Sequence, residues 1–397
     1  MELTLRQQEG LRIAVERYRN KEPYTVISGY AGAGKTTLVK FIIAALDLNP
    51  EKDVAYVAFT GKAATVLSKK GNPNAMTAHK LLYKAYQKPD GTFFFKPNPP
   101  GSLGYKIIVL DECSMLPKGM WDRLLSHRVY VIACGDPAQL PPINPEDDNH
   151  ALDKPHVFLD EIMRQAQDSE IIRLSMWVRE GKDIKDFNCS NKQVKILSKN
   201  DLVSGVYKWA DQILCATNAT RNSINTTMRQ YKGFGSTPEI GDKIVSLSNH
   251  WDISSANGNN VLTNGSIGII TDFNVISEHF PRFITPEPVD YMYTSMKIED
   301  EDDYFSSLPI DYNTLLKNQK TLNIKQNMQI KRSKQVFLNP PYDFAYAYAL
   351  TVHKFQGSEA PKILLVEENF PFAKEEHMRW LYTGITRASS RLVVVKK

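Results

Sequence analysis

The clearest chemical pattern in the sequence is the loop Gly29–Thr36, which has the form GxxxxGKT between an apolar stretch and a helix-forming stretch. Glycines in such a loop let successive backbone N–H groups surround phosphate oxygens, and the start of the following helix adds a favourable dipole. Lys35 is expected to reach the β- and γ-phosphates, and the Thr36 hydroxyl to bind Mg²⁺. The pattern predicts a site for ATP and Mg²⁺, and it leaves open what hydrolysis would drive. The residues expected to contact the nucleotide here are Gly29, Gly32, Gly34, Lys35, Thr36 and Thr37.

Two acidic residues follow the apolar strand expected at Ile107–Leu110. Asp111 comes directly after this strand, where a carboxylate can hold Mg²⁺ together with the water around the ion. Glu112 is then placed to orient and deprotonate an attacking water, which suits hydrolysis better than transfer to a metabolite. Two acids after a strand are common, so this prediction depends on the phosphate loop that accompanies them.

Three further side chains are candidates for contacts with the terminal phosphate. Gln139 lies in Gly135–Ile143, after another expected strand, and its uncharged amide suits sensing of the γ-phosphate. A surface turn imposed by proline and glycine is the alternative for this segment. Phosphoryl transfer also needs positive charge, often from another domain, and Arg164 and Arg387 are the two candidates. If Arg387 reaches the phosphates, the ATP lies between two parts of the chain, whereas an exposed ion pair is the alternative for either arginine.

Apolar stretches that alternate with helix-like stretches must position these residues. Strands are expected at Tyr24–Ser28, Val54–Phe59, Ile107–Leu110 and Val129–Ala133, and helices at Thr36–Leu46 and Lys62–Lys70. Nearly continuous apolar strands between helices are typical of a parallel sheet covered on both faces. The alternation returns later, with strands expected near Ile213–Ala216, Ile244–Leu247, Ile267–Ile270, Ile363–Val366 and Leu392–Val395 and a helix at Ala219–Tyr231. We therefore predict two α/β domains, residues 1–170 and 171–397.

Two stretches interrupt the alternation and are predicted to be insertions. Residues 83–105 combine a Pro89-Asp90-Gly91 turn, three phenylalanines and a return rich in proline and glycine, which predicts a hairpin followed by a loop. Residues 272–343 are longer and less regular, with an acidic run at 299–303 and a basic run at 331–334. For the acidic run we favour a solvated surface.

The composition is that of a globular protein with two or three domains. The chain has 397 residues, of which 42% are hydrophobic and 23% charged, and its net charge of +5 permits a polyanionic partner without requiring one. Its four cysteines form no CxxC pair and have no histidine at metal-ligand spacing, which favours a reducing compartment. The N-terminal stretch lacks the apolar core of a signal peptide, and no apolar run approaches the ~18 residues of a membrane span. We expect a cytoplasmic protein without a membrane partner.

Taken in order, these motifs resemble those of superfamily 1 helicases, in the B group that contains RecD and the small phage helicase Dda. The similarity extends from Leu3 to Arg387. Its most specific parts are LTVHKFQGSE at Leu350–Glu359 and YTGITRA at Tyr382–Ala388, which a general P-loop NTPase has no reason to carry. The resemblance implies an α/β protein with two RecA-like P-loop domains that contain parallel sheets, each domain with a small insertion. The other matching stretches are Ala58–Ala64, Met76–His79, Asp111–Met115, Gly135–Ile143, Arg164-Gln165 and Asn264-Gly265.

The resemblance also implies roles for individual residues. Gln7 would pair with the edge of adenine, Glu359 would touch the ribose, and Arg164 and Arg387 would be arginine fingers. The residues expected to line a single-strand channel are Thr60, Lys62, Thr77, His79, Thr351, His353 and Lys354.

The two insertions lie where relatives carry accessory elements. Residues 83–105 would form a pin that splits the duplex, and residues 272–343 a small β-barrel. Phe93, Phe94 or Phe95 would stack on the last base pair, because every base offers a flat face to an aromatic ring. Each of these phenylalanines could instead anchor the hairpin to the rest of the protein.

The implied activity is that of an ATP-dependent DNA helicase that moves 5′ to 3′ along single-stranded DNA and unwinds duplex DNA. ATP and Mg²⁺ would be its cofactors, and single-stranded DNA and junctions between single- and double-stranded DNA its partners, with RNA as an open alternative. Replication or recombination proteins are further candidate partners, a monomer is expected to suffice, and a bacterial or phage-infected cell is the expected setting. Two other functions stay open: a DNA-stimulated translocase that does not unwind alone, and a P-loop phosphotransferase for small molecules.

Overall fold

The chain forms two compact units in a computed structural model that describes residues 3–87, 93–142, 145–258, 261–299, 301–333, 339–369 and 373–396. Unit 1 consists of residues 1–216 and 351–397, and unit 2 of residues 217–350. The phosphate loop, the two acids and Arg387 therefore all belong to unit 1. In the described part of the chain, no helix is long and apolar enough to cross a bilayer.

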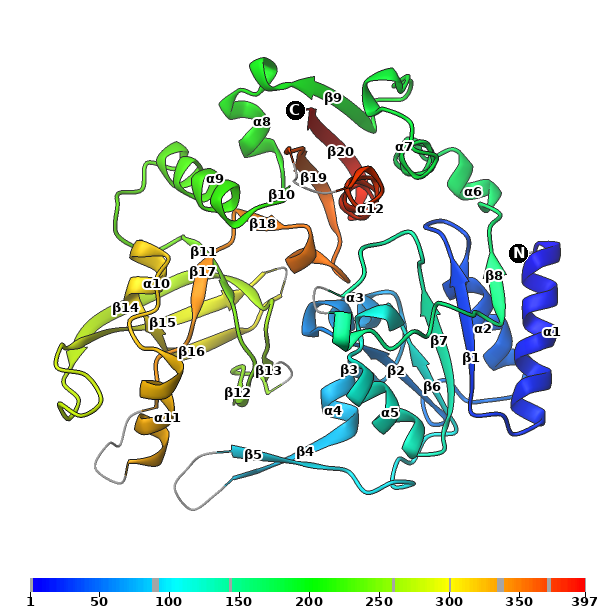
Figure 1. The fold of residues 1–397 in the computed structure, drawn as a ribbon, viewed down its shortest axis with the longest axis horizontal. Coiled ribbons are helices and arrows are strands. Elements are labelled where there is room, and N and C mark those ends of the chain that lie inside the picture. The colour runs from blue at the N-terminus through cyan, green and yellow to red at the C-terminus, as the bar shows by residue number, and fades with distance from the viewer. Residues whose placement is uncertain are drawn as a thin grey trace. The chain divides into compact units, whose positions relative to one another are not determined.

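Unit 1 contains a six-stranded parallel sheet with the strand order β3-β2-β6-β7-β1-β8 (Figure 1). All residues of β2, β6 and β7 are buried, because helices cover both faces of the sheet. Helices α1 and α2 pack on one face, and α4 and α5 on the other. The strands are β1 (Tyr24–Gly29), β2 (Val54–Ala58), β3 (Ala75–Thr77), β6 (Ile107–Leu110), β7 (Tyr130–Gly135) and β8 (Val157–Leu159). The helices are α1 (Leu5–Arg19), α2 (Lys35–Ala45), α3 (Gly61–Lys69), α4 (Ala78–Leu82) and α5 (Lys118–Ser126).

A two-stranded hairpin separates α4 from β6. Strand β4 (Tyr83–Gln87) pairs antiparallel with β5 (Phe93–Pro97), and both strands extend away from the parallel sheet (Figure 1). This pairing agrees with the hairpin predicted within residues 83–105. The predicted turn at Pro89-Asp90-Gly91 lies outside the described residues.

A second sheet has the strand order β18-β10-β19-β20-β9, and its strands β10, β19, β20 and β9 belong to unit 1. The pairs β10–β19, β19–β20 and β20–β9 are parallel. Helices α7 and α12 pack against each other and against β20. The strands are β9 (Val194–Ser198), β10 (Gln212–Cys215), β18 (Ala349–Thr351), β19 (Ala360–Val366) and β20 (Ala388–Lys396). The helices are α6 (Arg164–Gln167), α7 (Glu170–Arg179), α8 (Ser204–Trp209) and α12 (Lys374–Ile385).

Unit 2 is built on an antiparallel sheet with the order β16-β15-β14-β11-β17. The two edges of this sheet meet at one end, where the N–H of Tyr342 donates to the carbonyl of Pro309 (2.6 Å) and the N–H of Asp311 donates to the carbonyl of Tyr342 (2.9 Å). Closure of the whole sheet into a barrel stays a prediction. The strands are β11 (Lys243–Ser246), β12 (His250–Ser254), β13 (Val261–Leu262), β14 (Ile267–Glu278), β15 (Val289–Ile298), β16 (Tyr304–Asp311) and β17 (Phe344–Tyr346). The helices are α9 (Asn218–Tyr231), α10 (Tyr312–Lys317) and α11 (Ile324–Arg332).

The structure confirms the α/β class with two parallel sheets and corrects the assignment of two strands. The stretches near Ile244–Leu247 and Ile267–Ile270 were predicted for the second α/β domain, but they form β11 and β14 of the antiparallel sheet. That sheet therefore extends beyond the predicted insertion 272–343 on both sides. The cause is that an apolar stretch indicates a strand, whereas its sheet depends on which partner it pairs with. The predicted division between residues 170 and 171 falls inside unit 1, between its two parallel sheets.

Candidate functional site

The phosphate loop connects the buried strand β1 to helix α2. Gly32 and Gly34 have φ angles of +79° and +78°, a conformation that residues with a side chain rarely adopt. The Lys35 ammonium donates hydrogen bonds to the carbonyl oxygens of Gly29 (2.6 Å) and Tyr30 (3.1 Å). The lysine thus lies over its own loop, where phosphate oxygens can replace the two carbonyls as its partners.

Gln7 ties helix α1 to the phosphate loop. Its backbone N–H donates to Thr4 Oγ1 (3.3 Å) and its Oε1 accepts from the Thr4 N–H (3.1 Å), a capping box that starts α1. Its Nε2 donates to the carbonyl oxygens of Ala33 (3.3 Å) and Gly34 (3.4 Å). Gln7 is therefore buried beside the loop, and a contact with the edge of adenine requires its amide to exchange one of these partners.

Asp111 and Glu112 lie at the end of β6. Burial raises the pKa of Asp111 and the neighbouring Glu112 raises it further, whereas Lys35 lowers it. The Glu112 N–H donates to Asp111 Oδ1 at 3.0 Å, and Glu112 has a φ angle of +48°, which is strained for a residue other than glycine. A divalent cation beside Asp111 would favour its ionised form, and carboxylate oxygen is the ligand that Mg²⁺ prefers, so these residues fit Mg²⁺.

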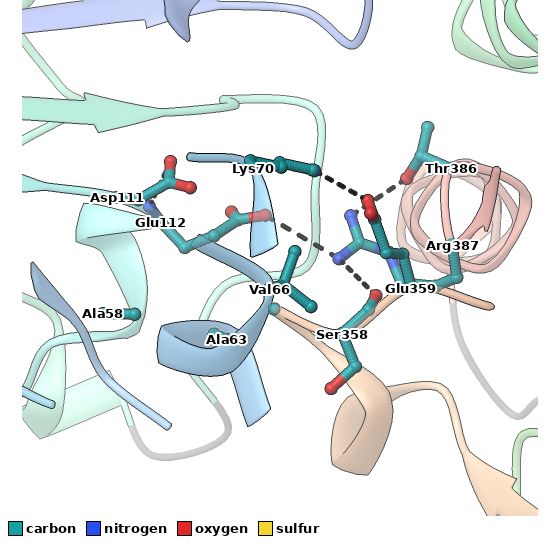
Figure 2. A pocket seen from close by; sticks show the side chains of 11 residues that line it. Ala58, Ala63, Val66, Lys70, Asp111, Glu112, Ser358, Glu359, Thr386 and Arg387 are labelled. Atoms are coloured by element: carbon teal, nitrogen blue, oxygen red, sulfur yellow. Dashed lines mark hydrogen bonds and ion pairs between the residues drawn. The ribbon is translucent and has the colours of Figure 1, made fainter. Parts of the chain in front are cut away.

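Arg387, Glu112 and Gln139 come together although they lie far apart in the sequence. Arg387 is 5% exposed, and its Nη1 lies 3.7 Å from Glu112 Oε1 (Figure 2). In the amide orientation that satisfies both neighbours, Gln139 donates to Glu112 Oε2 (3.3 Å) and accepts from Arg387 Nη2 (3.0 Å). The structure thus brings together Gln139 and Arg387, which were predicted to contact the terminal phosphate, and Glu112, which was predicted to activate the attacking water.

A pocket lies beside this cluster. Side chains of Asp111, Glu112 and Arg387 line it together with Lys70 from the end of α3 and Glu359 (Figure 2). The Lys70 ammonium lies 2.9 Å from Glu359 Oε2. Glu359, predicted to touch the ribose, is therefore engaged in an ion pair at this pocket.

Two family descriptions match the chain. The family described as AAA domain matches residues 6–205, about half of the chain, and the UvrD-like helicase C-terminal domain matches residues 346–395. The first region contains the phosphate loop and both acids, and the second contains Arg387. The chain belongs to the AAA domain family.

Together with these two matches, known relatives place the chain in the RecD/Dda type of superfamily 1. The ATP-dependent DNA helicase dda of Enterobacteria phage T4 is 30% identical over 148 residues, which is 36% of this chain and 34% of the relative. The ATP-dependent RecD2 DNA helicase of Deinococcus radiodurans is 32% identical over 153 residues, 37% of this chain and 20% of the relative. The chain thus matches about a third or less of these relatives.

Solved structures share the fold over the whole chain. The structure of Bacteroides Pif1 bound to single-stranded DNA has a TM-score of 0.55 and 18% identity, and the match covers 100% of this chain and 92% of Pif1. This superfamily 1 chain therefore has the two RecA-like domains of that structure, corresponding to the two parallel sheets of unit 1.

The three threonines predicted to contact DNA share one structural role in this superfamily 1 protein. Thr60, Thr77 and Thr351 each accept a hydrogen bond on Oγ1 from the backbone N–H three residues later, at 3.2, 3.2 and 3.3 Å. Thr60 and Thr77 cap α3 and α4, and Thr351 receives the N–H of Lys354 in the 3₁₀ turn His353–Phe355. Each hydroxyl keeps its proton for donation, so it can bind a phosphate oxygen while it orders the turn.

The other predicted DNA-binding residues lie in α3, in α4 and in the 3₁₀ turn that these threonines precede. The Lys62 ammonium is 4.7 Å from the ring centroid of Phe355, so α3 contacts the 3₁₀ turn. His79 stacks on Tyr83 with the ring centroids 4.4 Å apart. Burial lowers the pKa of His79 and of His353, which favours the neutral form of both imidazoles.

Of the three hairpin phenylalanines, the structure describes the side chain of Phe95 only. The ring of Phe95 packs edge to face against His79, with centroids 5.0 Å apart, which favours the anchoring alternative for Phe95. The side chains of Phe93 and Phe94, and that of Arg164 at the start of α6, lie outside the described part of the chain. Their roles stay predictions.

Two residues that the sequence analysis did not single out lie against the phosphate loop. The Arg179 guanidinium, at the end of α7, stacks 3.5 Å from the ring centroid of Tyr30, and its buried Nη1 has no hydrogen-bond partner among the described residues. Tyr382 of α12 also contacts the loop. Arg179 belongs to no motif, so no pattern could have identified it, whereas Tyr382 lies in the YTGITRA motif that also contains Arg387.

Proposed function

We propose that this protein is an ATP-dependent DNA helicase that hydrolyses ATP beside the phosphate loop, moves on single-stranded DNA and unwinds duplex DNA. The observation that carries the proposal is the cluster of Arg387, Glu112 and Gln139. It joins a cation from the C-terminal motif to the acid that follows β6, at the pocket next to Asp111. Arg387 precedes β20 of the second parallel sheet, whereas Glu112 follows β6 of the first. Phosphates that bind Arg387 would therefore change the contact between the two sheets.

The phosphate loop would hold ATP, with Gln7 at the adenine and Glu359 at the ribose once its ion pair with Lys70 opens. Lys35 would exchange the loop carbonyls for the β- and γ-phosphates. Thr36 and Asp111 would hold Mg²⁺, which supplies neutralisation of phosphate charge when bound.

Glu112 would orient and deprotonate the attacking water, and Gln139 would sense the γ-phosphate. In this structure both side chains are engaged with Arg387. A γ-phosphate carries more negative charge than one carboxylate, so its arrival would draw Arg387 away from Glu112. The acid would then be released to accept a proton, which couples base activation to the presence of ATP.

DNA would be held by hydroxyls and neutral imidazoles rather than by a dense positive surface. Thr60 and Thr77 would contact the backbone of the strand from one sheet, and Thr351 and His353 from the other. Alternating grip by these two groups, as the sheets close on ATP and open after hydrolysis, would move the protein along the strand. RNA offers similar contacts unless its 2′-OH clashes, so an RNA strand is the natural competitor in binding assays.

The deciding experiment measures ATP hydrolysis with and without single-stranded DNA, beside a strand-separation assay. A helicase shows DNA-stimulated hydrolysis and separation of the duplex, and a translocase shows the stimulation alone. A phosphotransferase needs an acceptor metabolite and ignores DNA. With Lys35→Ala as the hydrolysis-deficient reference, an ATPase rate that DNA leaves unchanged would reject the proposal.

The proposed 5′-to-3′ direction has its own test. A duplex with a single-stranded 5′ tail should be unwound, and one with a 3′ tail should not. Unwinding of the 3′-tailed duplex alone would reject this direction.

Replacing Phe95 with alanine is expected to reduce unwinding severalfold while ATP hydrolysis changes by less than about twofold, because the lost packing contact holds the hairpin and neither of its residues lines the pocket beside Glu112. The ring of Phe95 packs on His79 and thereby holds β5 against α4. Strand separation and DNA-stimulated ATPase measured on the same preparation give the two rates. Equal losses in both rates would show that Phe95 supports the motor rather than the hairpin.

A further inference from the structure

The hydroxyl of Tyr382 lies between the phosphate loop and the end of β7. It accepts a hydrogen bond from the backbone N–H of Ala31 (2.9 Å) and donates one to Asp136 Oδ2 (2.7 Å). Tyr382 is 1% exposed and Asp136 3% exposed, so water competes with neither bond. Through this one oxygen, helix α12 of the second parallel sheet touches the loop that is expected to bind phosphate.

The directions of these hydrogen bonds follow from their chemistry. A backbone N–H can only donate and a phenol has one proton, so the Tyr382 oxygen accepts from Ala31 and its proton points to Asp136. Burial raises the pKa of Tyr382 far above its ordinary value, and Asp136 raises it further, so the phenol stays protonated at any working pH. Burial also raises the pKa of Asp136, which Lys35 and the Tyr382 hydrogen bond oppose.

Helix α12 also holds the segment that carries Gln139. The N–H of Leu140 donates to Thr383 Oγ1 at 2.9 Å. One turn later, Arg387 Nε donates to the carbonyl of Thr383 at 3.1 Å. Tyr382 and Thr383 therefore connect the phosphate loop and the Gln139 segment to the turn of α12 that positions Arg387.

We propose that Tyr382 is a positioning residue for ATP hydrolysis, whose hydroxyl transmits the state of the phosphate loop to Arg387 through α12. This inference rests on the proposed function. Loop N–H groups are the groups that hold phosphate, so a change at Ala31 on nucleotide binding acts directly on Tyr382. Tyr382 lies in the last turn of α12 (Lys374–Ile385), and Arg387, two residues after the helix ends, is tied to that turn by its hydrogen bond to Thr383, so a shift at Tyr382 moves Arg387 relative to Glu112.

The hydroxyl, rather than the ring, carries this role. Phenylalanine would keep the buried ring and nearly the same volume, but it would leave the Ala31 N–H and one oxygen of Asp136 without their partner. Buried polar groups that lose a partner bear a desolvation cost, so the loop and α12 would separate or rearrange. A bound phosphate gives the loop N–H groups new partners, so nucleotide binding should suffer less than the rate.

The test compares Tyr382→Phe with Tyr346→Phe. Tyr346 is the matched control, since its buried hydroxyl has no hydrogen-bond partner among the described residues. With saturating single-stranded DNA, kcat for ATP hydrolysis is expected to fall about tenfold in Tyr382→Phe, with KM within about twofold, and to stay at the wild-type value in Tyr346→Phe. An unchanged kcat in Tyr382→Phe would overturn the proposal.

A second measurement separates positioning from a general loss of structure. In an Arg387→Ala background, Tyr382→Phe should change the residual rate of ATP hydrolysis by less than about twofold. The reason is that Tyr382 acts by positioning the Arg387 guanidinium, which this background lacks. An equal loss in both backgrounds would overturn the proposal. If Tyr382→Phe does not fold, Asp136→Asn, which removes the charge from the same hydrogen bond, replaces it in both comparisons. The proposed function fails on a different result, a wild-type ATPase rate that DNA does not change.

Discussion

An Arg387→Ala variant is expected to lose about 10³–10⁵-fold in kcat for ATP hydrolysis, the contribution of an arginine finger. The guanidinium is nearly fully buried and lies 3.7 Å from Glu112 Oε1, at the pocket that also contains Asp111. To act on a phosphate in this pocket, the guanidinium only has to exchange Glu112 for the phosphate as its partner. Because its charge acts mainly on the transition state, nucleotide affinity should change much less than kcat. Single-turnover hydrolysis and equilibrium nucleotide binding measure the two effects.

Two further arginine variants serve as controls for this prediction. Arg391→Ala removes an exposed arginine from β20 and should leave kcat unchanged. Arg387→Lys keeps the charge but lacks the fork with which Arg387 reaches Glu112 and Gln139 together, so it should restore only a small part of the rate. Wild-type kcat in Arg387→Ala would remove Arg387 from the proposed mechanism.

Replacing Glu112 with glutamine is expected to lower kcat by about 10²–10⁴-fold, the usual contribution of a general base. Glutamine has nearly the same shape and can still contact Gln139, but it cannot accept a proton from water. ATP binding should be retained or strengthened, because one negative charge near the phosphates is gone. The variant should therefore accumulate with ATP bound, which a nucleotide-retention assay followed by analysis of the bound nucleotide measures.

The control for this prediction is Glu51→Gln, at an exposed position before β2. It makes the same chemical change away from the pocket and should leave both hydrolysis and retention at wild-type values. Hydrolysis at the wild-type rate in Glu112→Gln would assign the general base to another residue.

Much of unit 1 could be predicted because its patterns are local. The apolar strands β1, β2, β6 and β7 and the glycine loop are each encoded by consecutive residues, so their positions agree with the predicted ranges to within one or two residues. Asp111 and Glu112 come directly after the last residue of β6, so the position of this strand also predicts their position. Strand β9 was not predicted, since only Val194 and Leu197 of its five residues are buried and it has no continuous apolar run.

Unit 2 shows where local patterns were insufficient. The apolar stretches that form β11 and β14 look like those of a parallel sheet, yet they pair antiparallel with each other. Pairing depends on which strands the rest of the chain makes available, which a short window of sequence does not contain. The acidic and basic runs between residues 299 and 334 likewise indicated polar surface without indicating the sheet to which it belongs.

Residue types and spacing were enough to establish the chemistry of the site: a phosphate loop, an acid for Mg²⁺, a base for water, and two candidate arginines. A loop that binds phosphate is built by consecutive residues, so a short stretch of sequence is enough to identify it. Only the folded structure brought Arg387 to Glu112 and Gln139, placed Tyr382 on the phosphate loop, and put Phe95 against His79. These contacts join residues from separate strands and helices, and their distances depend on how the two sheets of unit 1 and their helices pack.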